Sequence, residues 1–132
     1  MTMGTVLLVD DDVGMRLTMS RILERQGYRV LSASGGTAAL ALAADTPFDV
    51  ALVDFRMPGM DGAETCARLG GLCPQARLYL VTAHVTPESA VAAEAGGPAG
   101  ILFKPVDVGC LLALIAEAVG SPGPAAMIVG GV

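Results

Sequence analysis

The amino-acid sequence predicts an α/β protein in which a parallel β-sheet carries helices on both of its faces. The short apolar runs Val6–Val9 and Val50–Val53 contain no polar alternation, which is typical of strands buried on both faces of a parallel sheet. Segments with helical periodicity follow such runs, and the connections between them are short. Together these observations predict five consecutive βα units.

Length, composition and charge limit the class of protein. A chain of 132 residues predicts one domain that is long enough to bury a sizeable core. No apolar run approaches the roughly 18 residues that a membrane span needs, and no export signal is apparent. Three cysteines without a CxxC pair fit the reducing cytoplasm. A net charge of −5 argues against direct nucleic-acid binding. We therefore expect a soluble cytoplasmic protein.

The first two units occupy residues 5–47. A strand over 5–9 runs into three aspartates, and a helix begins after Asp12, which is well placed as its N-cap. Gly27 ends this helix as a C′ glycine. Four apolar residues at the spacing i, i+4, i+7 and i+8 share one face of it: Met15, Met19, Ile22 and Leu23. A strand over 28–33 then precedes a helix rich in alanine and leucine, which Pro47 ends.

The central strand over 50–53 ends on Asp54, and further helices and strands alternate after it. They are expected at 63–69 (helix, closed by Gly70-Gly71), 77–81 (strand), 87–95 (helix, from Pro87), 100–103 (strand) and 108–119 (helix, with Leu111, Leu112 and Ile115 in the core). We predict that residues 1–120 form the domain. The Pro- and Gly-rich residues 121–132 are expected to be a flexible tail or the remnant of a linker.

Polar side chains stand where four of the predicted strands end. They are Asp10, Asp11, Asp12, Asp54, Thr82 and Lys104. Each has an ordinary explanation when taken alone, such as a turn, a helix cap or a solvated charge. Because the carboxyl ends of parallel strands meet at one edge of the sheet, we expect all of them to converge there. Carboxylates clustered without histidine or cysteine favour a hard divalent cation, and Mg²⁺ is the abundant one.

This combination of groups is suited to phosphoryl chemistry. A bound Mg²⁺, an ammonium and a hydroxyl can together hold the oxygens of a phosphoryl group. A carboxylate such as that of Asp54 can then act as nucleophile and carry the phosphoryl as an acyl phosphate. The sequence contains no glycine-rich phosphate loop, so a nucleotide is an unexpected donor.

Five motifs in order resemble the receiver domains of two-component response regulators, including the single-domain chemotaxis regulator. They are Val-Asp-Asp-Asp at 9–12, the strand that ends on Asp54, Met-Pro-Gly-Met-Asp-Gly at 57–62, Val-Thr-Ala at 81–83 and Lys-Pro at 104–105. The resemblance spans about residues 6–119. It implies a flavodoxin-like, doubly wound (βα)5 fold with a five-stranded parallel sheet of order 2-1-3-4-5.

The same resemblance implies a role for each residue of the site. Asp54 would be the phosphoacceptor and would ligate Mg²⁺ together with Asp11 and the backbone carbonyl of Arg56. Asp10 would support the metal through water or outer contacts. Thr82 would bond one phosphoryl oxygen and Lys104 another.

Two local features also follow from the comparison with the family. The peptide bond between Lys104 and Pro105 is expected to be cis. Ile101 stands where the family usually has an aromatic residue that changes rotamer on activation, so the resemblance implies only the Thr82 half of this switch.

The function expected from the resemblance is a phosphorylation-activated signalling switch. Asp54 would take a phosphoryl group from a sensor histidine kinase or phosphotransfer protein, and would lose it slowly to water, without action on an external substrate. The switch would then address a downstream protein or a fused output domain. A homodimer through the helix over 87–95, the strand over 100–103 and the helix over 108–119 is a further expectation.

Alternative functions are less well supported by the residues. A hydrolase with an aspartyl-phosphate intermediate would carry an acid two residues after Asp54, where this chain has Arg56. A phosphorylation-independent binding module would have lost a residue of the site, and none is missing. Arg56 and His84 flank the expected site, and they either lie in solvent or slow the approach of water to the phosphoryl group.

Overall fold

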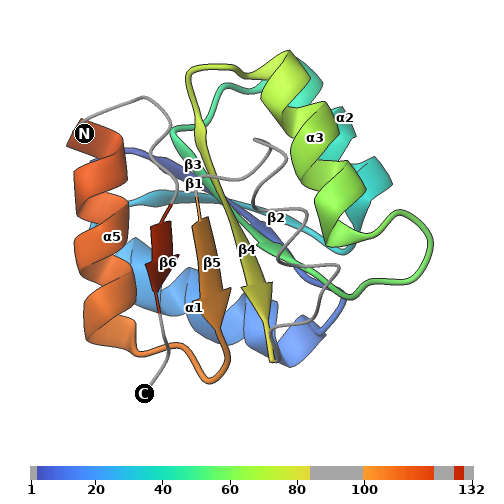
Figure 1. The fold of residues 1–132 in the computed structure, drawn as a ribbon. Helices are drawn as coiled ribbons and strands as arrows, with labels where there is room; N and C mark the ends of the chain where they lie inside the picture. The colour runs from blue at the N-terminus through green and yellow to red at the C-terminus, as the bar shows by residue number, and fades with distance from the viewer. Residues whose placement is uncertain (1–2, 84–99, 121–126, 130–132) are drawn as a thin grey trace.

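The computed structural model describes residues 3–83, 100–120 and 127–129, and within these ranges six parallel strands form one sheet. The strands are β1 (Thr5–Val9), β2 (Arg29–Ala33), β3 (Val50–Asp54), β4 (Arg77–Thr82), β5 (Gly100–Phe103) and β6 (Met127–Val129). Their order is β2-β1-β3-β4-β5-β6, which confirms the predicted order of the first five (Figure 1).

Four helices in the described ranges cover this sheet. They are α1 (Val13–Arg25), α2 (Gly36–Asp45), α3 (Gly62–Leu72) and α5 (Val108–Gly120). Figure 1 shows α1 and α5 on one face of the sheet and α2 and α3 on the other, which confirms the doubly wound fold. The helix predicted over 87–95 lies outside the described residues. None of the described helices combines the length and apolarity that a membrane crossing requires.

Two hydrophobic clusters fill the spaces between the sheet and its helices. Leu7 and Val9 of β1 face the cluster under α2 and α3, whereas Val6 and Leu8 face the cluster under α1 and α5. All four side chains are buried, because both faces of a parallel sheet are covered by helices. This double burial is why the strands are apolar without alternation.

The boundaries of α1 agree with the sequence. The Asp12 carboxylate accepts a hydrogen bond from the Met15 amide at 3.1 Å, which is the predicted N-cap. Gly27 follows the helix with a φ of 95°, a left-handed conformation that favours glycine. On the predicted apolar face Leu23 is fully buried, whereas Met15 is 38% exposed.

The prediction that Gly70-Gly71 closes the third helix is wrong. Helix α3 continues to Leu72, and the Cys73 amide still donates to the Leu69 carbonyl at 2.8 Å. Glycine weakens a helix but leaves its hydrogen bonds possible, and the fully buried Leu69 holds this turn on the sheet. The following Pro74 has no amide hydrogen to continue the helix, so the helix ends before it.

Two further differences concern the end of the chain. Helix α5 buries Leu111 and Ile115 as predicted, but Leu114 is buried as well and Leu112 only partly. The short strand β6 was not predicted, and it pairs in parallel with β5 from Gly100 to Leu102. The rest of residues 121–132 lies outside the described residues, so the expected tail stays a prediction there.

Candidate functional site

The parallel register of the sheet brings the predicted site residues to one edge. Val9 of β1 pairs with Val53 of β3, so Asp10 and Asp54, the next residues, lie side by side. Thr82 ends β4, and its carbonyl accepts a hydrogen bond from the Lys104 amide at 2.8 Å. The predicted convergence of these strand ends is therefore what the structure shows.

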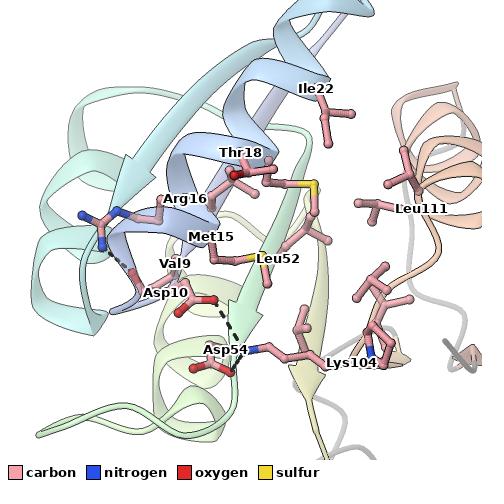
Figure 2. A pocket seen from close by; sticks show the side chains of 17 residues that line it. Val9, Asp10, Met15, Arg16, Thr18, Ile22, Leu52, Asp54, Lys104 and Leu111 are labelled. Atoms are coloured by element: carbon pink, nitrogen blue, oxygen red, sulfur yellow. Dashed lines mark hydrogen bonds and ion pairs between the residues drawn. The ribbon is translucent and has the colours of Figure 1, made fainter. Parts of the chain in front are cut away.

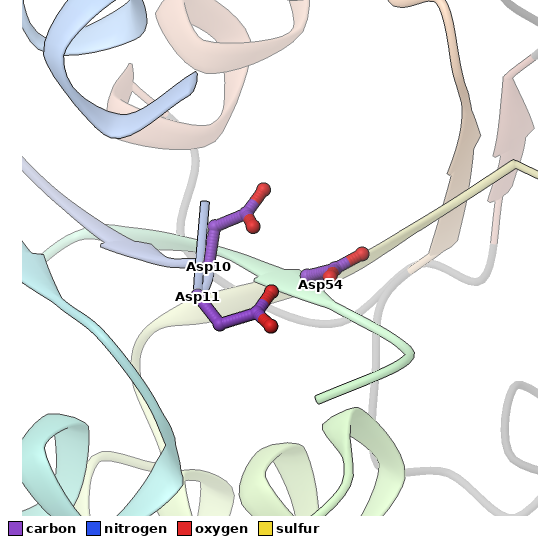
Figure 3. A group of neighbouring side chains, drawn as sticks. All are labelled: Asp10, Asp11 and Asp54. Carbon is purple, nitrogen blue, oxygen red and sulfur yellow. The ribbon is translucent and has the colours of Figure 1, made fainter. Parts of the chain in front are cut away.

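Three carboxylates form an acidic cluster at this edge, defined by Asp10, Asp11 and Asp54 (Figure 3). One oxygen atom from each carboxylate lies within 4.8 Å of the corresponding atoms of the other two. Asp10 and Asp54 are only 9% and 8% exposed, whereas Asp11 is exposed to solvent. Asp12 stands apart because its carboxylate caps α1. Hard cations prefer such oxygen-only sets of ligands, so the cluster fits Mg²⁺ or a similar ion.

Lys104 supplies the positive charge of the site (Figure 2). Its Nζ lies 3.2 Å from Asp54 Oδ1 and 3.6 Å from Asp10 Oδ2. The peptide bond from Lys104 to Pro105 is cis, as predicted. The ammonium is thus centred between the two buried carboxylates and within reach of any group bound to Asp54.

The electrostatic balance of the site is negative. Burial raises the pKa of Asp54 above its ordinary value, and the charges of Asp10 and Asp11 act in the same direction, which together outweigh the opposing effect of Lys104. For Lys104 burial lowers the pKa, but its pairing with Asp54 and Asp10 outweighs burial and leaves the pKa raised. One ammonium therefore does not compensate three acids, and a bound cation would relieve the repulsion.

Residues around the cluster complete the description of the site. Thr82 is buried at the end of β4. Arg56, in the loop after β3, is exposed, and its guanidinium carbon lies 6.0 Å from the centre of the Phe55 ring. The roles implied for the Thr82 hydroxyl and the Arg56 carbonyl stay predictions. His84 lies outside the described residues.

Two residues help to position the site in a way that the sequence analysis did not assign, although Gly62 is the last residue of the motif at 57–62. Arg16 of α1 donates through Nη1 to the Asp10 carbonyl at 2.6 Å and so ties the helix to the acidic turn (Figure 2). Gly62 begins α3 against the backbone of β3, where an added Cβ would lie 2.4 Å from the Asp54 carbonyl oxygen. The turn before α3 was the only signal in the sequence for either residue. Neither contact follows from the sequence, because both depend on how the helices pack.

Fold and site together define a class of protein: a doubly wound α/β domain whose carboxylates and lysine meet at the carboxyl edge of the sheet. The family model of the response regulator receiver domain matches residues 6–116. The chain belongs to this family.

Similar proteins agree with that assignment. A response regulator receiver protein of Anaeromyxobacter sp. (strain Fw109-5) is 40% identical over 112 residues, which are 85% of this chain and 47% of that protein. The chain thus spans about half or less of the length of the first curated relatives that it matches.

Solved structures of receiver domains have the same fold. A CheY-like receiver domain from Methanospirillum hungatei JF-1 has a TM-score of 0.84 and 31% identity, over 88% of this chain and 93% of that one. A response regulator of Burkholderia pseudomallei has a TM-score of 0.78 and 32% identity, over 88% and 69%. That structure contains a phosphorylated aspartic acid, a calcium ion and citrate.

Proposed function

We propose that this protein is a phosphorylation-controlled switch in which Asp54 accepts a phosphoryl group from a phosphohistidine of a sensor kinase or phosphotransfer protein. One observation carries the proposal: the Asp54 carboxylate is buried at the end of the central strand, 3.2 Å from Lys104 and within the acidic cluster. A related regulator that carries a phosphorylated aspartic acid and a calcium ion supports it.

The chemistry follows from the residues at the sheet edge. An oxygen of Asp54 attacks the phosphorus atom, the bond to the histidine nitrogen breaks, and the imidazole leaves with the electron pair and takes up a proton. Lys104 then moves its ion pair from the Asp54 carboxylate to an oxygen of the bound phosphoryl group. Thr82 donates its hydroxyl hydrogen to another phosphoryl oxygen.

The acidic cluster is proposed to hold Mg²⁺. Asp11, Asp54 and the backbone carbonyl of Arg56 are its ligands, and Asp10 supports it through water or outer contacts. The close approach of three carboxylate oxygens favours this assignment, since their mutual repulsion falls when a cation is shared. When bound, the ion supplies positive charge that offsets the negative charge of the phosphoryl oxygens.

Phosphorylation would change how the protein binds its partners, and the protein would not act on an external substrate. Position 101 holds an isoleucine, which has no aromatic ring to change rotamer. This side chain is 1% exposed and packs in the cluster under α2 and α3. We therefore propose that Thr82 and Lys104 transmit the change. The receiver would act in the cytoplasm on a downstream protein or a fused output domain, and the face of the helix over 87–95, β5 and α5 is the candidate dimer interface.

The experiment is phosphorylation by acetyl phosphate with and without Mg²⁺, followed by intact mass spectrometry. The parent should gain one phosphoryl group only with Mg²⁺, and hydroxylamine should remove it, as it does from an acyl phosphate. Asp54→Asn should gain none, whereas the control Asp45→Asn, an exposed acid at the end of α2, should behave as the parent. Equal labelling of Asp54→Asn would contradict the proposal.

A further inference from the structure

An apolar pocket lies between α1 and α5, on the face of the sheet that these two helices cover, and Asp54 is one of the residues that line it (Figure 2). Its volume is about 250 Å³. Four leucines line it and are almost fully buried: Leu8, Leu52, Leu102 and Leu111. Met15 and Val108 also line the pocket and are each 38% exposed, so the pocket is accessible between the two helices.

The charged residues that line this pocket already have partners. Lys104 pairs with Asp54 and Asp10 at 3.2 and 3.6 Å, and Arg16 donates to the Asp10 carbonyl at 2.6 Å. An ion entering the pocket would lose its hydration and would have to compete for these existing pairs. An uncharged apolar molecule loses little hydration and gains contacts with the leucines. Outside the acidic cluster, which is suited to a cation, the lining therefore favours an uncharged ligand.

The size and the flexibility of the walls indicate what kind of molecule fits. A protein cavity of about 150 Å³ lined by Leu, Ile and Phe stays dry and binds benzene. The larger pocket here has room for about two fused rings or a branched aliphatic molecule. Met15 and Met19 line it from α1, and unbranched thioether side chains adapt to the shape of a ligand.

We propose that the pocket between α1 and α5 binds a small uncharged apolar molecule, aromatic or branched aliphatic. This pocket adjoins the proposed phosphorylation site, because Asp10, Asp54 and Lys104 are among the residues that line it. The proposal needs neither a bound metal nor phosphorylation. It can therefore be tested on the metal-free, unphosphorylated protein, and its failure would leave the proposed phosphotransfer function untouched.

The test is a titration of the methyl-labelled full chain with indole, an uncharged two-ring probe, followed by NMR. Saturable shifts should centre on the methyl groups of Leu8, Leu52, Leu102 and Leu111. Indole-3-acetate, which adds a carboxylate to the same ring system, should bind at least tenfold more weakly. Shifts that are absent, linear or scattered over the surface would overturn the proposal. So would equal affinity for the two probes, and this comparison uses only the parent protein.

A pair of variants tests whether the probe binds in the pocket. Leu111→Phe adds bulk to the wall of the pocket and should weaken indole binding at least fivefold. Leu112→Phe is the matched control, because Leu112 is the next residue of α5, is only partly buried and does not line the pocket. Indole should bind this control as it binds the parent. Equal binding by the two variants would contradict the assigned site.

Discussion

Replacing Asp11 by asparagine should change the stability of the protein in opposite directions with and without Mg²⁺. Two unit charges 4.8 Å apart, the limit that the cluster sets, repel by about 3.5 kcal/mol at an effective dielectric constant of 20. Asp11 takes part in two of the three repulsive pairs, but its exposure to solvent reduces the effect. We expect the metal-free variant to be more stable than the parent by about 1 kcal/mol, which is about 4 °C in melting temperature.

Mg²⁺ should reverse this order. A ligand that binds only the folded state stabilises it by RT ln(1 + [L]/Kd), which is about 1.4 kcal/mol at tenfold excess over Kd. The parent should therefore gain about 5 °C in melting temperature at that concentration. Asp11→Asn has lost a charged ligand and should gain little. The predicted signature is thus a variant with a higher melting temperature in chelator and little response to the ion.

The assay is thermal unfolding followed by circular dichroism, first in chelator and then over a Mg²⁺ series. Glu24→Gln is the control, since it removes one exposed negative charge from α1, outside the acidic cluster. Its response to Mg²⁺ should equal that of the parent. A Mg²⁺ response that persists in Asp11→Asn, or a metal-free variant less stable than the parent, would refute the reasoning about the cluster.

Three further predictions follow from the site and its supports. Burial raises the pKa of Asp54 in the folded state above its unfolded-state value near 3.8. The stability that Asp54 contributes to the metal-free protein is therefore complete below pH 3.8 and is lost as the pH rises through the raised pKa. Urea unfolding at a series of pH values should show this loss in the parent and not in Asp54→Asn. Lys104→Ala should keep the Mg²⁺ response in thermal unfolding but lose stable phosphorylation by acetyl phosphate, and unchanged phosphorylation would contradict the role of the ammonium. Gly62→Ala should lower the free energy of unfolding in urea by about 1–3 kcal/mol, because the added Cβ meets the Asp54 carbonyl oxygen at 2.4 Å. Gly71→Ala in the same helix is the control and should not destabilise the protein, because a Cβ there meets no described atom within 4 Å. Equal losses of stability in the two variants would contradict this prediction.

The convergence of the site could be predicted because it depends on topology alone. Once Asp10, Asp54 and Lys104 are placed at the ends of parallel strands, the register of the sheet brings them together. The burial of the strands followed from their unbroken apolar runs in the same way. Local signals also placed the Asp12 cap and the Gly27 end of α1.

Features that depend on packing were beyond the sequence. The glycine pair near the end of α3 is a local stop signal, but the burial of Leu69 outweighs it. The contact of Arg16 with Asp10 and the close approach of Gly62 to β3 join elements whose relative placement only the folded chain defines. The three-residue strand β6 is too short for periodicity to reveal. The pocket is likewise a product of the distance between two helices.

The most direct test of the central claim is to locate the phosphoryl group itself. Borohydride reduces an aspartyl phosphate to homoserine, so the protein should be treated with acetyl phosphate and Mg²⁺, reduced, digested and sequenced by mass spectrometry. Our account predicts homoserine at position 54, dependent on Mg²⁺ and absent from Asp54→Asn. Homoserine at position 10, 11 or 12 in place of 54, or no reduction product from a protein that has gained phosphate, would contradict it.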